Sequence, residues 1–231
     1  LVEPLPTPMA RVLAEPIGRF CAAAHVDHGV DLRLGTGVAE LRGEGRVEAV
    51  VLDDGQELPA DVVVVGIGAF PETRWLEGSG LALDDGVLCD ERCAASAPGV
   101  VAVGDVARWR HPGYGESIRI EHWTNAVEQA DAAAERLLAG PGAEPFAPVP
   151  FVWSDQYDLK IQAVGRIAPD DEMAIVHGSL EERRFVALFG RKGQLAGALG
   201  INRVRQLMGY RRMLREGVSF EAAVDAARDS R

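Results

Sequence analysis

The sequence predicts an α/β protein with a separate α+β module at its C-terminal end, and three observations support this prediction. Residues 61–66 form a continuous run rich in β-branched side chains, which is typical of a strand buried on both faces of a parallel sheet. Helical and strand patterns alternate around this run, as they do in a doubly wound domain. After a proline-containing stretch at 142–150, the pattern changes to successive hairpin strands followed by two helices.

The first elements are a helix and a small set of strands. Apolar residues at helical spacing over 8–28 predict a helix. We expect Pro16 to separate an entry turn from the main helix and Gly29 to end it. The elements expected after it are the start of a strand at 30–34, a hairpin of 37–41 with 47–52, and a returning strand at 56–58.

Two elements are predicted in the middle of the chain. Residues 100–103 resemble a second short buried strand, which stops at Gly104. Residues 124–139 carry an apolar stripe at helical spacing, and the glycine and proline at 140–141 end that helix.

The C-terminal module should be built of hairpins and helices. The strands expected in it are 160–164, 172–177, 185–189 and 194–201, and the helices are 204–216 and 220–227. Ser219 is placed to cap the last helix.

Composition and charge exclude several classes of protein. The 231 residues hold 24 basic and 35 acidic side chains, so the net charge is −11, which argues against a nucleic-acid binder. No apolar run approaches the roughly 20 residues that a membrane-spanning helix needs. The chain opens at Leu1 with neither an initiator methionine nor a signal peptide, so we expect it to be cut from something longer.

The cysteines and histidines give no sign of a disulfide scaffold or a metal site. Cys21, Cys89 and Cys93 cannot all pair and form no CxxC motif, which predicts a reducing, cytoplasmic environment. We expect Cys89 and Cys93 to be ordinary small residues in a loop-like segment. His25 and His28 have a possible metal spacing but no third ligand nearby, so the prediction is a surface helix end and no metal.

Two positions are candidates for binding a nicotinamide dinucleotide. An acidic residue at the end of the second strand of a dinucleotide fold binds the adenosine ribose, and Glu3 fits that role. Its carboxylate would repel the 2′-phosphate of NADP, which favours NADH; the alternative is an ordinary exposed glutamate before a turn. Residues 66–71 follow the predicted buried strand with two glycines, which would let a ligand approach the backbone or simply form a turn with positive φ.

Two further positions suit a flavin. Asp105 follows a buried run and a glycine, so its carboxylate could accept hydrogen bonds from a polyol; a helix N-cap is the alternative. Residues 120–125 lead into the helix at 124–139, where free backbone N–H groups near His122 and Trp123 would attract the negative end of a reduced flavin. Simple capping of that helix by Thr124 is the alternative reading.

Together these motifs resemble one family. Glu3, the stretches 66–71, 102–105 and 121–130, and residues 153–157 (WSDQY) occur in this order. They look like the FAD-dependent NADH:ferredoxin reductases of the putidaredoxin, rubredoxin and dioxygenase type, within the pyridine nucleotide-disulfide oxidoreductase superfamily. The resemblance covers the later part of that family's chain. It implies a partial fold with two dinucleotide-binding domains plus a C-terminal α+β reductase domain: 1–68 in the NADH domain, 69–148 the returning FAD segment, and 149–231 the C-terminal domain.

The resemblance also implies roles for single residues. FAD would be bound by Gly104, Asp105, Glu121, His122, Trp123 and Trp153, and NADH by Glu3, Arg11, Ile67 and Gly68. No residue is expected to act as an acid–base catalyst, because the flavin carries out the chemistry and Glu121 only lies near its ring. Because both glycine-rich nucleotide loops are absent from the sequence, we expect this chain by itself to bind FAD poorly.

The expected partner is an acidic ferredoxin-type iron–sulfur protein that serves an oxygenase or cytochrome P450. A basic strip could steer it toward the flavin and Trp153; its members are Arg203, Arg205, Arg211, Arg212 and Arg215. The alternative is a solvated helix face. Other activities remain open: an NADH oxidase, a nitrite-reductase-associated flavoprotein, or a flavoprotein of the apoptosis-inducing-factor kind that acts mainly by interaction.

Overall fold

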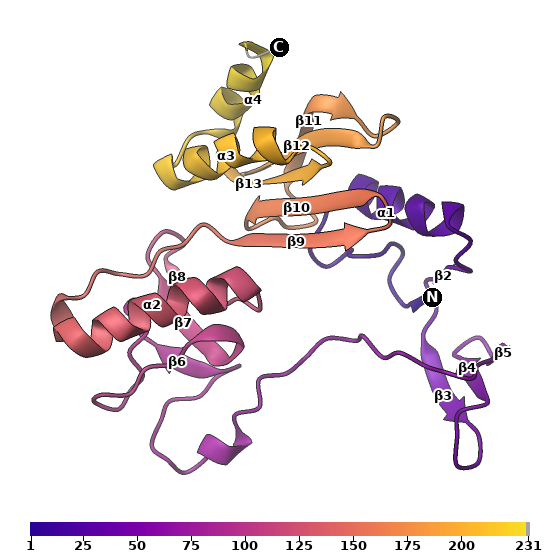
Figure 1. Ribbon diagram of the computed structural model, residues 1–231, viewed down its shortest axis with the longest axis horizontal. Coiled ribbons are helices and arrows are strands. Elements are labelled where there is room, and N and C mark those ends of the chain that lie inside the picture. Colours follow the sequence, from indigo (N-terminus) through magenta and orange to yellow (C-terminus); the bar gives the residue numbers. More distant parts are fainter. Residues whose placement is uncertain (230–231) are drawn as a thin grey trace. The chain divides into compact units, whose positions relative to one another are not determined.

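The computed structural model describes residues 1–229 (Figure 1), which divide into two compact units. One unit holds residues 1–68 and 167–173, and the other holds the remaining described residues. Within residues 1–229, no helix has the length and hydrophobicity to cross a membrane.

The first unit begins with a strand–helix–strand motif. Strand β1 (Val2–Glu3) pairs in parallel with β2 (Arg33–Leu34), and α1 (Glu15–Asp27) lies between them in the chain. The predicted helix at 8–28 is therefore too long at its start, because Met9 has a positive φ and accepts hydrogen bonds in a separate turn. Pro16 lies in the first turn of α1, and Gly29 follows its end at φ +79°, as the sequence predicts.

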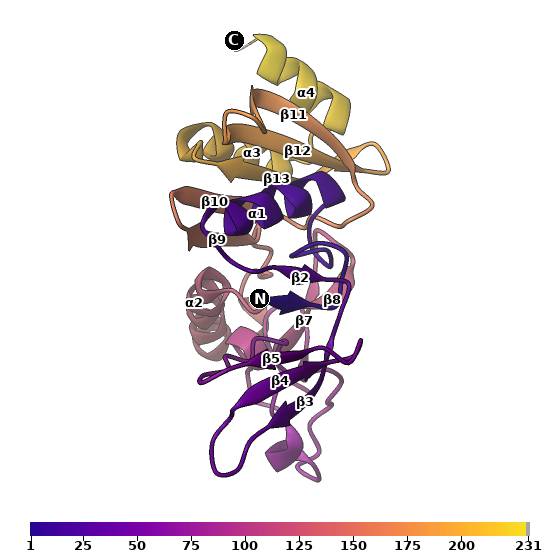
Figure 2. The same cartoon turned by 90° about the vertical axis from the view of Figure 1, so that its right-hand side faces the viewer.

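A three-stranded antiparallel sheet completes the regular structure of the first unit. Figure 2 shows its strands side by side: β3 (Val38–Arg42), β4 (Ala49–Leu52) and β5 (Glu57–Pro59). The structure thus confirms the predicted hairpin and returning strand.

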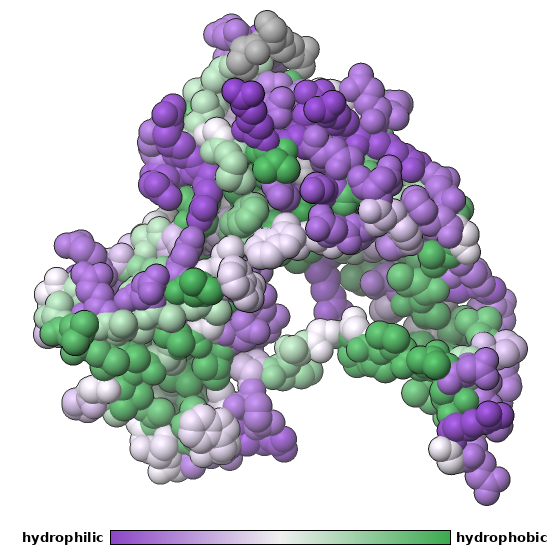
Figure 3. Space-filling view, viewed as in Figure 1, coloured by the Kyte–Doolittle hydropathy of each residue, from purple (hydrophilic) through white to green (hydrophobic). Residues whose placement is uncertain are grey.

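The prediction of a buried strand at 61–66 is wrong. After β5 the chain runs without strand pairing, and Val64 is 91% exposed. Figure 3 shows hydrophobic surface along this stretch. A parallel strand needs a hydrogen-bonded neighbour, and no described residue pairs with 61–66. The strand expected at 100–103 is reduced to one bridge, between Val101 and Ala94.

The second unit opens with a mixed sheet and a long helix. Strand β6 (Val87–Cys89) pairs in parallel with β7 (Ala107–His111), which pairs antiparallel with β8 (Glu116–Arg119). Helix α2 (Trp123–Ala139) follows, and the short 3₁₀ turns are η1 (Arg74–Leu76), η2 (Gly104–Val106) and η3 (Gly140–Gly142). Cys89 and Cys93 are buried in its core with Trp109, so the loop-like placement expected for Cys89 is wrong.

The rest of the second unit is the C-terminal module. Its five strands are β9 (Phe151–Gln156), β10 (Leu159–Gly165), β11 (Glu172–Ser179), β12 (Arg184–Arg191) and β13 (Gln194–Ile201), in the sheet order β11-β12-β13-β10-β9. Helices α3 (Val204–Glu216) and α4 (Phe220–Asp229) follow the strands (Figure 1). Leu188 of the sheet packs in one cluster with Leu207 and Phe220 of the helices. Ser219 accepts a hydrogen bond from the Ala222 N–H, which confirms the predicted cap.

Candidate functional site

The glycine and aspartate after residue 103 form the short turn η2. Gly104 adopts φ +70°, and its N–H donates to Oε1 of Gln129 on α2 at 2.8 Å. This hydrogen bond holds η2 against the helix and leaves the Asp105 side chain exposed. The reading of Asp105 as the N-cap of a helix is wrong, because η2 begins at Gly104 and α2 only at Trp123. The carboxylate is available to a ligand.

In the part of the chain that the structure describes, no side chain caps the first turn of α2. His122 is the N-cap residue, with an extended backbone, and the Thr124 hydroxyl donates instead to the Phe151 carbonyl oxygen at 2.8 Å. The alternative that Thr124 caps this helix is therefore wrong. The N–H groups of the first turn and the positive end of the helix dipole form an anion-attracting site beside the exposed Trp123.

Two buried polar atoms at this helix start have no hydrogen-bond partner among the described residues: Nδ1 of His122 and Oδ1 of Asn125. Burial lowers the pKa of His122 below its usual range, although Asp105 and Glu121 act in the opposite direction. A buried polar atom without a partner costs free energy, so the arrangement suits a polar ligand that supplies the missing contacts.

Arg119 joins the separate segments of this site and was missed in the sequence analysis. Its guanidinium forms an ion pair with Glu121, lies 3.2 Å from the Asp85 carboxylate, and donates to the Asp105 carbonyl oxygen at 3.1 Å. The side chain is only 13% exposed. These contacts fix the orientation of Glu121 relative to η2. The only signal in the sequence was a basic residue two positions before the acid.

A cavity of about 340 Å³ brings these groups together. Asp105, Arg119 and Glu121 line one part of it, and Phe70 and Trp75 line another. The structure therefore brings the predicted Asp105 and Glu121 to one cavity. Ile67 and Gly68 precede it on the extended stretch, with Gly68 at φ +99° and Ile67 exposed.

An aromatic cluster lies beside the start of α2. Trp123 and Trp153 meet edge to face with ring centroids 6.2 Å apart, and Phe151 stacks on Trp153 at 5.7 Å. Trp153 is 44% exposed, so it presents aromatic surface next to the helix terminus. The structure thus joins Trp153 to the predicted flavin residues.

Glu3 lies at the end of β1, opposite Leu34 of β2. Its Oε1 accepts a hydrogen bond from the Leu5 N–H at 2.9 Å, so the carboxylate also stabilises the following turn. Arg11 is exposed in the turn before α1.

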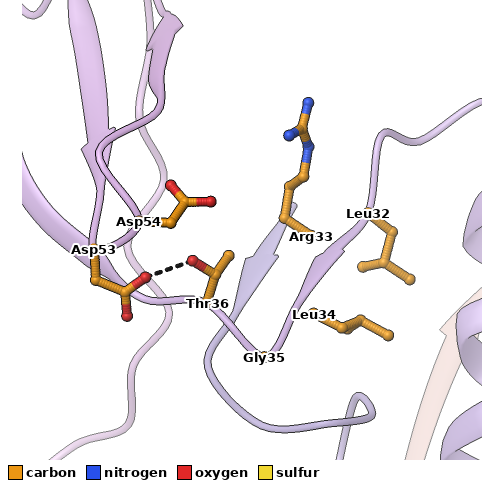
Figure 4. A pocket seen from close by; sticks show the side chains of 7 residues that line it. All are labelled: Leu32, Arg33, Leu34, Gly35, Thr36, Asp53 and Asp54. Carbon is orange, nitrogen blue, oxygen red and sulfur yellow. Dashed lines mark hydrogen bonds between the residues drawn. The ribbon is translucent and has the colours of Figure 1, made fainter.

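A second cavity, of about 610 Å³, lies at the carboxyl end of β2 (Figure 4). Thr36 and Asp53 are hydrogen-bonded in its wall, and the Gly37 N–H donates to Asp53 at 2.8 Å. These two donors lower the pKa of Asp53. Open α/β sheets bind ligands at the carboxyl ends of their parallel strands, and this cavity and Glu3 lie at the carboxyl ends of β2 and β1.

The arginines of α3 do not form one uniform strip. Arg211 is half-buried: it donates to Glu128 of α2 at 3.2 Å and to the Val149 carbonyl oxygen at 3.3 Å, and its guanidinium lies 5.9 Å from the Phe151 ring centroid. Arg212, in contrast, is exposed and lies 3.5 Å from Glu216. Arg211 therefore holds α3 to α2, whereas Arg212 faces solvent.

The three cysteines are buried and unpaired. Desolvation raises the pKa of Cys21 and Cys89 to about 11 and that of Cys93 to about 12. All three thiols therefore stay protonated near neutral pH and are poor nucleophiles. In the part of the chain that the structure describes, no group of three or more potential ligands is placed to hold a metal ion.

Comparison with known proteins gives the family. Residues 1–130 match the family described as pyridine nucleotide-disulphide oxidoreductase. The chain belongs to this family. Residues 151–231 match a reductase C-terminal domain, which agrees with the separate module of the fold.

The relatives are ferredoxin reductases. The chain is 36% identical to the 5,5'-dehydrodivanillate O-demethylase ferredoxin reductase subunit of Sphingobium sp., over 96% of this chain and 54% of that protein. Among solved structures, a ferredoxin reductase of Rhodopseudomonas palustris matches with a TM-score of 0.89 and 36% identity, covering 96% of this chain and 55% of the other. The reductase in a covalent putidaredoxin reductase–putidaredoxin complex matches with a TM-score of 0.87 and 31% identity, covering 94% and 52%. The chain spans about half the length of the relatives it matches.

The residues at η2 and the start of α2 fit the FAD that this family uses. The exposed Asp105 carboxylate can accept hydrogen bonds from polyol hydroxyls. The uncapped N-terminus of α2 beside it is the positive end of the helix dipole and suits the anionic edge of the ring. Among the described residues, Nδ1 of His122 and Oδ1 of Asn125 are buried polar atoms without a hydrogen-bond partner at this helix start.

Proposed function

We propose that this chain is part of an FAD-dependent reductase. This reductase passes electrons from NADH to a ferredoxin-type iron–sulfur protein of an oxygenase or cytochrome P450 system. The observation that supports it most is the uncapped start of α2 beside Asp105 and Glu121. When bound, the flavin supplies hydride acceptance and single-electron release. The names of the relatives agree with this activity.

Each site residue has a part in this proposal. The Asp105 carboxylate accepts hydrogen bonds from the ribityl chain, and Gly104 lets η2 lie close to α2. The backbone at His122 and Trp123 holds the pyrimidine edge of the flavin, where negative charge develops on reduction. Arg119 orients Glu121 near the nicotinamide. Trp153 packs beside the ring, next to Trp123.

NADH rather than NADPH is the proposed electron donor. Glu3 would accept hydrogen bonds from the ribose hydroxyls and repel a 2′-phosphate. Arg11 would lie alongside the adenosine, and Ile67 and Gly68 would line the path of the nicotinamide. Glu3→Gln should narrow the preference for NADH, measured as the ratio of kcat/KM for the two dinucleotides. An unchanged ratio would remove Glu3 from this role.

Steady-state NADH oxidation tests the function. The flavin-loaded reductase is supplied with a ferredoxin, dioxygen or a dye, and fastest turnover with the ferredoxin is expected. Fast turnover with dioxygen would instead identify an NADH oxidase. Slow turnover with every acceptor, together with a long-lived NADH–flavin complex, would identify an interaction protein.

The docking surface is also a proposal. We place the ferredoxin against Trp153, against Arg203 at the N-cap of α3, and against the basic residues within α3, namely Arg205, Arg211, Arg212 and Arg215. Exposed charges act mainly through long-range attraction, so Arg205→Glu with Arg212→Glu should slow ferredoxin reduction most at low salt. Reduction of a neutral dye is the control and should not change. Arg211→Glu is a poor test, because it also breaks the contact with Glu128.

Two broader expectations stay proposals. The division into 1–68, 69–148 and 149–231 as NADH, FAD and reductase domains is one, and limited proteolysis at these boundaries tests it. A reducing, cytoplasmic location is the other, supported by three unpaired cysteines and tested by cell fractionation.

A further inference from the structure

A groove of about 800 Å³ lies in the C-terminal module, away from the residues assigned to flavin and NADH. It is bordered by β11, α3 and α4. Its volume falls in the range of pockets that hold small molecules. The elements around it share the core cluster that includes Leu188, Leu207 and Phe220, so its walls are well supported.

The polar side of the groove is rich in hydrogen-bond donors. Arg203 and Arg212 line it, together with His177, whose Nε2 lies 2.9 Å from the Tyr210 hydroxyl. Among the described residues that line the groove, Glu182 is the one acid. Among the described residues, the buried Nε of Arg203 has no hydrogen-bond partner. Arg212 also lies 3.5 Å from Glu216, so Arg203 is the cation that the groove offers most directly to an anion.

The other side of the groove is apolar. Met213 of α3 and Ala226 and Ala227 of α4 line it. A ligand that fits both sides carries a negative group at one end and a hydrocarbon body at the other.

Gly209 gives an independent reason to expect a ligand. It lies in the middle of α3 and faces the groove, although glycine destabilises a helix relative to alanine. A Cβ atom at this position would meet no atom of the described residues within 4 Å, so packing against them does not require glycine. The missing side chain keeps the groove open. At Gly178, on the same groove, glycine is required instead by φ +65° and by the Arg184 carbonyl oxygen.

We propose that this groove binds a small organic carboxylate with an apolar body, such as an aromatic acid. The planar guanidinium of Arg203 matches a carboxylate, to which it can donate two parallel hydrogen bonds. Met213 and the two alanines contact the hydrocarbon part. The groove is separate from the residues assigned to flavin and NADH, but it shares Arg203 and Arg212 with the proposed ferredoxin surface, so a bound acid would act as an effector at that surface.

Titration of the full chain with benzoate tests this proposal, followed by the amide shifts of residues in α3 and α4 in ¹H–¹⁵N NMR spectra. Saturable shifts are expected around the groove. Arg203→Gln should weaken binding about tenfold or more. Arg205→Gln is the matched control: it removes an exposed charge from the same helix, outside the groove, and should bind benzoate as the parent does.

A second variant separates loss of the site from loss of the fold. Gly209→Leu should abolish benzoate binding by filling the groove, while the midpoint of thermal unfolding stays the same or rises, because leucine favours the helix. Inorganic phosphate should bind more weakly than benzoate. Equal binding of phosphate, equal benzoate affinity in Arg203→Gln and the parent, or no saturable shifts in the parent would each overturn the proposal.

Discussion

Two runs of this chain that consist only of apolar residues have opposite environments. Residues 185–189 form the centre of β12 and are completely buried. Residues 62–65 are four consecutive valines that belong to no strand, and most of their surface is exposed. Strand β12 pairs with β13 through a short turn, so its partner is close in sequence. A parallel strand needs a partner from far away along the chain, and none pairs with 62–65 among the described residues. An apolar run thus predicts burial reliably only where nearby sequence supplies the pairing.

The largest expected effect is the loss of stability when a buried side chain of β12 is truncated. Leu188→Ala removes a fully buried side chain and should lower the free energy of unfolding by about 2–5 kcal/mol. Val64→Ala should change it by less than about 0.5 kcal/mol, because Val64 is exposed. Urea denaturation of both variants measures the two values. A comparable loss from Val64→Ala would mean that the valine run packs in solution, and the contrast would fail.

Two glycines extend the comparison from side-chain burial to backbone packing. Gly190 of β12 lies under Phe220 of α4, and a Cβ atom there would come 2.5 Å from the Phe220 ring. Gly190→Ala should cost about 1–3 kcal/mol, as overpacking does in a tight core. A Cβ atom on Gly66 would meet none of the described atoms within 4 Å, so Gly66→Ala should have little effect on the free energy of unfolding.

The double variant Gly190→Ala with Phe220→Leu shows whether the contact with the Phe220 ring causes the loss of stability in Gly190→Ala. A smaller aliphatic side chain leaves room for the added methyl group, so the two substitutions should cost less together than the sum of their separate effects. If the free-energy changes of the two substitutions simply add, the loss in Gly190→Ala comes from the strand and not from the contact with Phe220.

The same contrast explains how much of the fold could be predicted. Strand β13 and helix α3 match their predicted limits residue for residue, because clear turns bound the apolar strand and the helical spacing of α3. Strand β9 was missed, since its burial does not alternate. Strand β7 was missed although Ala107, Trp109 and His111 alternate with exposed or half-buried arginines, a period of two that was visible in the sequence.

The candidate site was predictable in its chain positions but not in its contacts. Asp105 stands out in the sequence because it follows the apolar stretch 100–103, and Glu121 stands out because it precedes helix α2. Arg119 gives no such signal: its role depends on Asp85, 34 residues earlier, and on the Asp105 carbonyl oxygen. Thr124 has the pattern of a cap, but the Phe151 carbonyl oxygen takes its hydroxyl hydrogen bond. Long-range partners decided both cases.

The smallest expected effect is on the pH dependence of the free energy of unfolding. It concerns the segment around β7, which lies in the sequence between residues 62–65 and residues 185–189. His111 of β7 is buried: its Nε2 donates to the Pro148 carbonyl oxygen at 2.9 Å, and its ring stacks on Tyr114 with centroids 4.2 Å apart. Burial lowers the pKa of His111 below its usual value of about 6.5, and the nearby Arg166 guanidinium acts in the same direction. Arg166 follows β10 and lies 5.1 Å over the Tyr114 ring, so this histidine reports on the contact between the segment and the C-terminal module.

A histidine that is harder to protonate when folded stabilises the protein above its unfolded pKa. That stability is lost as the pH falls below about 6.5 toward the lower native pKa, because the unfolded chain then binds more protons than the folded one. The slope from His111 is at most about 1.4 kcal/mol per pH unit, the limit for one proton. His111→Gln keeps a donor for Pro148 and should flatten the dependence between about pH 7 and pH 5, measured by urea denaturation at each pH. His122, whose pKa is also lowered, accounts for part of what remains. If His111→Gln leaves the slope unchanged, the segment around β7 opens before the C-terminal module unfolds, and the self-contained region is limited to the five-stranded sheet and its two helices.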